Sequence, residues 1–94
     1  MKFVWDDRKN KTNQLKHKVS FETAKLVFED PMQLNILDRY EGNEERWQTI
    51  GLVNGILLLL VAHTMREAFS DEIVRIISAR KATKSETKKY EQSI

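Results

Sequence analysis

Two arginines in the C-terminal quarter of the sequence have the chemistry and the setting of phosphate ligands. Arg75 alternates with isoleucines, so a strand here places a guanidinium group among apolar side chains. Arg80 follows where this apolar stretch ends, close to the start of a basic helical segment, and a helix N-terminus with added cations favours anions. The structural alternative for Arg75 is an ion pair with Glu45 or Glu72 across a sheet, or a place at a sheet edge.

The two histidines are the side chains whose pKa lies nearest neutral pH in model compounds. His63 is therefore the candidate general acid or base, although a single histidine at a strand end is more often a hydrogen-bonded structural residue. His17 ends a polar helical segment, where the helix dipole also favours a cation. The two lie far apart in the sequence and the chain has no cysteine, which argues against a zinc motif and a thiol nucleophile.

Other patterns exclude further classes of site. The acidic middle of the chain lacks EF-hand spacing, and its three glycines form no phosphate-binding loop. We therefore expect no metal and no cofactor. A site made of Arg, Lys and His suits RNA cleavage by the 2′-hydroxyl, because that reaction needs a base, an acid and cations that stabilise the phosphorane.

The charge distribution indicates a polyanionic partner. Residues 1–18 and residues 75–94 each hold six Lys or Arg against two acidic residues, net +4, while residues 19–74 hold four against ten, net −6. If the two ends meet in space, they form one basic face suited to RNA. The alternative is two ordinary solvated helices.

The hydrophobic periodicity indicates which elements must position these residues. Strands are expected at residues 3–5, 32–36, 46–53, 56–62 and 73–78, with helices at 8–16, from 20 to about 30, and from 83 onward. Ser20 and the Thr83–Glu86 capping box open the last two helices, and Asn54-Gly55 predicts a tight hairpin turn, whereas residues 40–45 and 65–71 are expected to be a turn and a loop. The order predicts an α+β fold with two N-terminal helices, an antiparallel sheet of four to five strands and a C-terminal helix.

At 94 residues the chain is long enough for one domain, expected to span residues 1–94. The start carries an acidic pair instead of an apolar signal-peptide core, and the longest apolar run, residues 56–62, is too short to span a membrane. A cytoplasmic location without membrane contact is expected.

The segments resemble the BrnT family in order and at sensible spacing over essentially the whole chain. The matching runs are residues 3–6 (FVWD), 19–24 (VSFETA), 28–31 (FEDP), 45–51 (ERWQTIG), 61–64 (VAHT) and 75–82 (RIISARKA), with Lys9, Asn13, Lys16, His17, Glu86 and Tyr90. The family often has glycine where this chain has Lys18, so the turn into the second helix is expected to differ locally.

The resemblance implies a RelE-like fold and a type II toxin whose metal-independent ribonuclease activity halts translation and growth. It also implies neutralisation by a ribbon-helix-helix antitoxin resembling BrnA, in a heterotetramer that binds operator DNA only through the antitoxin. The substrate is RNA, either free or on the ribosome. The residues expected to act in catalysis are Arg75, Arg80, His63 and Arg46, and those expected to bind RNA are Lys16, His17, Lys81, Lys89 and Tyr90.

Two other functions fit the same residues. One is a non-catalytic module that uses the basic face to hold RNA or a protein, and the other is a degenerate toxin that acts only with its antitoxin. All three functions predict salt-sensitive binding of phosphate, so cleavage of RNA in EDTA is the observation that separates them.

Overall fold

The helices and strands follow one another in the order that the sequence predicts, and the computed structural model describes all 94 residues. None of the helices is long and apolar enough to cross a membrane. The elements are β1 (Lys2–Val4), α1 (Asp7–His17), α2 (Phe21–Ala24), the 3-10 helix η1 (Lys25–Glu29), β2 (Leu34–Glu41), β3 (Glu44–Val53), β4 (Leu57–Ala68), β5 (Asp71–Lys81) and α3 (Lys84–Gln92).

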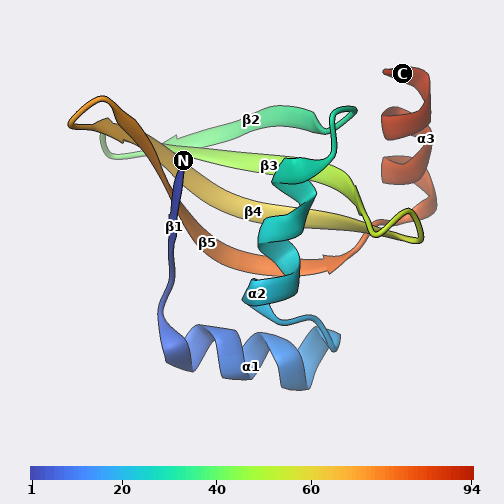
Figure 1. Cartoon of the computed structure of the whole chain (residues 1–94), viewed down its shortest axis with the longest axis horizontal. Coiled ribbons are helices and arrows are strands. Elements are labelled where there is room, and N and C mark those ends of the chain that lie inside the picture. The colour runs from blue at the N-terminus through green and yellow to red at the C-terminus, as the bar shows by residue number, and fades with distance from the viewer.

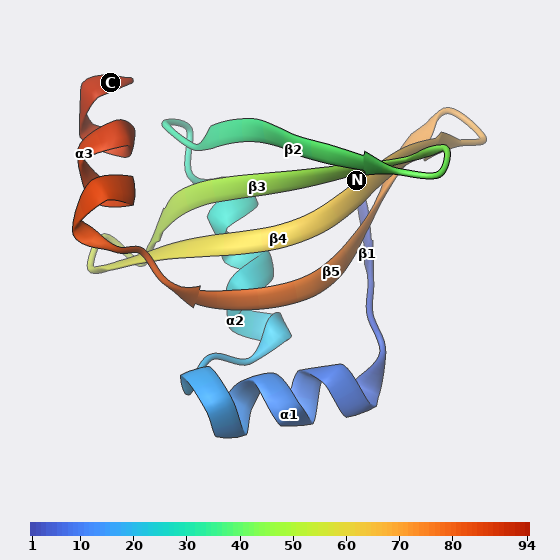
Figure 2. The same ribbon diagram turned by 180° about the vertical axis from the view of Figure 1, so that it is seen from behind.

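The five strands form one mixed sheet (Figures 1 and 2), in the order β1-β5-β4-β3-β2. β2 to β5 are an antiparallel meander, whereas β1 pairs in parallel with β5, with Phe3 opposite Val74. The predicted α+β class is therefore confirmed, but the expectation of a wholly antiparallel sheet is wrong. No hairpin joins β1 to its partner β5, because all the other strands and the helices α1, α2 and η1 lie between them in the chain. Only a short hairpin connection requires antiparallel pairing, so β1 can pair in parallel.

The strands extend further at their polar ends than the periodicity predicts. β2 continues through Tyr40 and reverses at residues 42–43, so much of the turn expected at 40–45 is strand. β4 continues to Ala68, and the chain reverses at Phe69 and Ser70, which both have positive φ. The expected loop at 65–71 is therefore largely strand.

α2 and η1 cover one face of the sheet and form the main core (Figure 1). Ser20 caps α2 by accepting the Thr23 N–H, as predicted. Phe21 and Val27 are fully buried against the sheet. η1 approaches β3 so closely that a Cβ on Gly51 would lie 2.7 Å from the Val27 Cβ, which explains the glycine there.

α3 covers only one end of the opposite face, and the rest of that face is open (Figure 2). Tyr90 packs there on Ile50 and Leu60 in a second, smaller cluster. Its hydroxyl donates a hydrogen bond of 2.5 Å to Oδ2 of Asp30, at the end of η1. The predicted capping box at Thr83 is also present. α3 is therefore fixed to the sheet at a defined position.

Two buried asparagines hold α1, a helix whose only large apolar side chain, Leu15, is exposed. Asn13 pairs with the Ala79 backbone much as a strand would: its Nδ2 donates to the carbonyl (2.8 Å) and its Oδ1 accepts the N–H (3.1 Å). Asn10 accepts the Phe21 N–H at 2.8 Å. α1 therefore lies against the part of the β5 edge that β1 leaves unpaired.

Candidate functional site

Three arginines stand in one row across the open face of the sheet. Arg39 is opposite Arg46, Arg46 is opposite Thr64, and Thr64 is opposite Arg75. Residues directly opposite one another on neighbouring antiparallel strands have their side chains on one face, about 5 Å apart. We call this row, with the neighbouring Ser78, the arginine face.

Two β-bulges bring these side chains to the same face. Ile77 is an extra residue in β5, and it places Arg75, Ser78 and Arg80 on one side of the sheet. Uninterrupted alternation would put Arg75 and Arg80 on opposite faces. A second bulge in β2, at Asp38, shifts the register just before Arg39 in the same way. Bulges of this kind often re-aim side chains beside functional sites.

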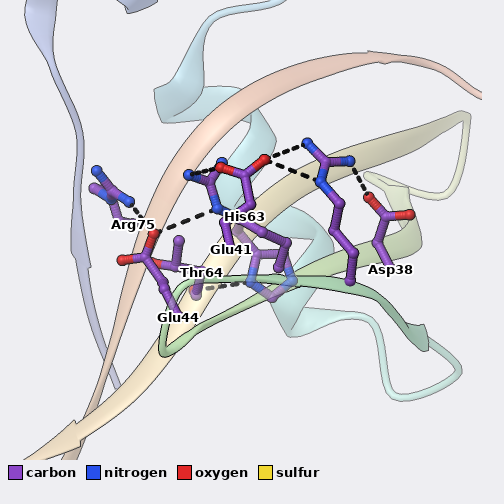
Figure 3. A network of polar contacts seen from close by, with 8 residues as sticks. Asp38, Glu41, Glu44, His63, Thr64 and Arg75 are labelled. Atoms are coloured by element: carbon purple, nitrogen blue, oxygen red, sulfur yellow. Dashed lines mark hydrogen bonds and ion pairs between the residues drawn. The ribbon is translucent and has the colours of Figure 1, made fainter.

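Glu44 joins two arginines of the row, Arg46 and Arg75 (Figure 3). Its Oε1 lies 2.8 Å from Nη2 of Arg75 and 3.3 Å from Nε of Arg46. The longer contact is close but not aligned as a hydrogen bond, and the buried Nε of Arg46 has no other acceptor. The ion pair that was the structural alternative for Arg75 is therefore observed, but its partner is Glu44 rather than Glu45 or Glu72.

Glu41 and Asp38 continue this chain of ion pairs to the third arginine, Arg39. Glu41 lies 3.0 Å from Nη2 of Arg46, and it also contacts the Arg39 guanidinium at 2.9 Å. The hydrogen bond from Arg39, helped by the charge of Arg46, holds the pKa of Glu41 below its ordinary value. Asp38 closes the chain at 2.9 Å from Arg39. Three cations and three carboxylates thus balance one another.

A shallow cavity of about 220 Å³ opens beside this row. Its polar lining includes Asp38, Arg39, Arg46, Gln48 and Ser78, and Ala62 lies between the last two in the sheet. Arginine and hydroxyl groups around a hollow are suited to a phosphate, because the guanidinium is a fork of donors that matches its oxygens.

Arg80 lies on the same face but is fully engaged with α3. Its Nη1 and Nη2 donate to Oε1 and Oε2 of Glu86 at 2.8 and 2.9 Å. Glu86 is also the capping-box residue that accepts the Thr83 N–H. The hydrogen bonds from Arg80 outweigh partial burial and lower the pKa of Glu86 to about 2. Arg80 is thus positioned by α3 at the border of the arginine face.

The comparison with known proteins identifies the family. The sequence matches the model for the family described as "Ribonuclease toxin, BrnT, of type II toxin-antitoxin system" over residues 5–86. The chain belongs to the BrnT family. Its fold is similar to the crystal structure of the Brucella abortus ribonuclease toxin BrnT, with a TM-score of 0.60 and 24% identity over 89% of this chain and 99% of that one. No functionally curated protein matches the sequence.

His63 has a different environment in this BrnT family member from the one its predicted role requires. The side chain is fully buried and faces the main core, where its ring packs edge-on against Phe28 at 5.0 Å. Its nitrogens lie 2.7 Å from the Thr49 hydroxyl and 3.1 Å from the Thr64 carbonyl. Burial lowers the pKa of His63, which favours the neutral ring. This is the hydrogen-bonded structural histidine that the sequence left as the alternative.

The residues predicted to bind RNA are not brought together. Lys16 and His17 line a cavity between α1 and β5. Lys81 is exposed at the end of β5, and Lys89 is exposed on α3. The hydroxyl of Tyr90 is bound to Asp30, and this bond raises the pKa of Tyr90 to about 12. The two basic ends of the chain thus lie at different borders of the sheet (Figures 1 and 2) instead of forming one cluster.

The sequence interpretation missed several members of the site. Arg39, Glu41 and Glu44 lie on polar strand ends that the interpretation assigned to a turn or its surroundings. Thr64 and Ser78 carry no distinctive spacing. The available signal was the alternation of Arg39 with Glu41 and of Glu44 with Arg46, which is also typical of paired strands.

Proposed function

We propose that this chain is a ribonuclease toxin that cleaves RNA at the arginine face without a metal ion. The observation that carries the proposal is the row of Arg39, Arg46 and Arg75, aligned with Ser78 by the bulge at Ile77. Membership of the BrnT family supports the substrate class. Metal independence is part of the proposal, because the arginines of this face can themselves stabilise the charge that develops on the phosphorane.

In the proposed complex, a phosphate of RNA replaces Glu44 on Arg75 and Arg46. The side chains of these pairs are partly exposed, so loss of the pairs costs little, and the buried Nε of Arg46 gains the acceptor that it lacks. Fixed guanidinium groups then stabilise the charge that develops on the phosphorane. This is the arginines' proposed contribution to the reaction.

Glu44 is the proposed general base. Once displaced from Arg75, its carboxylate remains on the same face and accepts the 2′-hydroxyl proton. The 2′-oxygen attacks phosphorus, the bond to the 5′-oxygen breaks, and the departing oxygen takes a proton from water. The products are a 2′,3′-cyclic phosphate and a 5′-hydroxyl. His63 has no part in this scheme, because its ring is fully buried and packs against Phe28.

The first test is cleavage of an RNA oligonucleotide by the purified chain in EDTA. Arg75→Gln and Arg46→Gln are each expected to lower kcat/KM by roughly 10²–10³-fold, the usual loss for one oxyanion donor. Lys88→Gln is the control, because Lys88 is exposed on α3, away from the row, and forms no ion pair. Equal losses in all three variants would contradict a localised site.

A second test addresses the base. Glu44→Gln is expected to lower kcat by roughly 10²–10⁴-fold while leaving RNA binding intact. An unchanged kcat in this variant would exclude Glu44. Absence of cleavage by the wild-type chain, with RNA binding preserved, would instead favour the non-catalytic module.

Membership of the BrnT family also supports a proposal for the partner and the location. We infer a ribbon-helix-helix partner resembling BrnA, in a heterotetramer that contacts operator DNA through the antitoxin. We also infer that the toxin has a RelE-like fold and acts in the cytoplasm. Co-expression with the neighbouring reading frame, followed by mass measurement of the purified complex, tests the partner and the stoichiometry. Relief of growth arrest by that partner tests the toxin function.

A further inference from the structure

A second cavity, of about 340 Å³, lies between α1 and the open edge of β5. Asn13 forms part of its wall through its bonds to Ala79, so the helix cannot rotate this face away from the sheet without breaking them. The other lining residues are mostly basic or polar. They are Arg8, Lys9, Thr12, Lys16, His17, Ile77 and Ser78.

The basic residues of this cavity differ from the arginines of the sheet because no carboxylate of the chain neutralises them. Every ion pair in the structure involves other groups. Arg8 and Lys16 lie eight residues apart on α1, about 12 Å along the helix, with the Thr12 hydroxyl between them, and Lys9 follows Arg8. Three unpaired cations spread along a hollow suit a polyanion better than a single small anion.

The two cavities meet at the β5 bulge. Ile77 and Ser78 line both of them, one cavity on the α1 side and the other on the arginine face. A chain of phosphates lying along α1 can therefore cross β5 at this point and reach Arg46. Continuity with the arginine-lined cavity, where the proposed function places a phosphate, favours nucleic acid over an acidic protein segment.

We propose that the groove between α1 and β5 binds the backbone of single-stranded RNA adjacent to the phosphate held on the arginine face. This inference rests on the proposed function for the position of the cleaved phosphate. Lys9 and Lys16 contact phosphates on one side of the cleavage point, and the bulge at Ile77–Ser78 guides the strand from one cavity to the other. The groove contributes binding along the strand and no step of the reaction.

The test uses a fluorescent 2′-O-methyl RNA oligonucleotide, which cannot be cleaved by 2′-oxygen attack, so binding is measured separately from catalysis. Lys9→Gln/Lys16→Gln removes two charges from the groove, and Lys84→Gln/Lys88→Gln removes two exposed charges from α3 as a matched control. All four lysines are exposed, so both variants are expected to fold.

The groove variant is expected to bind roughly 10- to 30-fold more weakly at 0.1 M salt, with the slope of log K against log salt reduced by about 1.4, as for two lost contacts to a single strand. The control is expected to keep both values. Equal losses in the two variants, or no loss in either, would overturn the groove. Unchanged RNA binding with lost binding of a poly-glutamate peptide would also overturn it and assign the surface to an acidic protein segment.

Cleavage of unmodified RNA by the wild-type chain is measured in parallel. Weaker binding by the groove variant without any wild-type cleavage would support the groove and contradict the proposed ribonuclease. Wild-type cleavage with unaltered binding by the groove variant would support the proposed ribonuclease and contradict the groove. The two proposals therefore fail in distinguishable ways.

Discussion

The hydrogen bond between Tyr90 and Asp30 is the contact whose removal most directly tests how α3 is fixed. The Tyr90 hydroxyl donates to Oδ2 of Asp30 at 2.5 Å, and the same oxygen accepts the Leu52 N–H at 2.8 Å. Tyr90 is 6% exposed, and its ring packs on Ile50 and Leu60. Tyr90→Phe keeps this packing and removes only the hydroxyl.

Two estimates give the magnitude of the loss. A hydrogen bond to a charged group contributes about 1.5–3 kcal/mol. Independently, the bond to Asp30 raises the pKa of Tyr90 to about 12 from 10.0, and two units correspond to at most about 2.7 kcal/mol. We expect Tyr90→Phe to lower the free energy of unfolding by about 2 kcal/mol, which corresponds to a fall in Tm of roughly 8–16 °C for a domain of this size.

The pH dependence has a definite sign. Because the folded pKa of Tyr90 lies above the unfolded value, the contribution is complete below pH 10 and is lost as pH rises toward about 12. Urea unfolding at pH 7, 9 and 11 should therefore show a constant difference between wild type and variant that narrows at the highest pH. Tyr40→Phe is the control, since Tyr40 is 62% exposed. A loss below about 0.5 kcal/mol in Tyr90→Phe, or the same loss in both variants, would refute the reasoning.

Three further changes test other contacts by urea or thermal unfolding. Asn13→Ala should destabilise the chain by about 2–4 kcal/mol, because it leaves the buried N–H and carbonyl of Ala79 without partners; a loss below 1 kcal/mol would contradict this role. Gly51→Ala should cost about 1–3 kcal/mol, since the added Cβ lies 2.7 Å from that of Val27, and an unchanged Tm would show that η1 moves away freely. Lys18→Gly should stabilise by about 1 kcal/mol, because Lys18 has φ 60 at the end of α1; destabilisation would show that its side chain contributes more than its strain.

Local signals in the sequence predicted the parts of the fold that a few neighbouring residues determine. The caps at Ser20 and Thr83 are present because a hydroxyl beside free helical N–H groups needs no distant partner. Asn54 and Gly55 have φ values of 53 and 72, as their hairpin turn requires. These features could be predicted because their cause lies within four residues of sequence.

Pairing between strands was the information that the sequence lacked. The segment at 65–71 mixes apolar and charged residues without regular alternation, and only its partners in β5 show that Arg66 is in a strand, opposite Ile73. The parallel pairing of β1 depends on the path through α1 and α2, which no local pattern describes. Polar residues at exposed strand ends have the composition of loops, so hydrophobic periodicity ends before the strand does.

The candidate site shows the same limit in a sharper form. The sequence shows which cations the chain has, and Arg75 stands out by its place among isoleucines. The sequence does not show whether Arg75 and Arg80 share a face of the sheet, because one extra residue at Ile77 decides this. Nothing in the local sequence distinguishes Ile77 from Ile76 as the bulged residue.

The arrangement of carboxylates explains how an arginine row can exist on a stable sheet and still be available to phosphate. Three adjacent guanidinium groups would repel one another, and Glu41 and Glu44 offset that repulsion. Glu41 precedes the turn at residues 42–43 and Glu44 follows it, so displacement of that single turn frees Arg46 and Arg75 together. In the proposed reaction, the Glu44 carboxylate that neutralises Arg46 and Arg75 also serves as the base once a phosphate has taken its place.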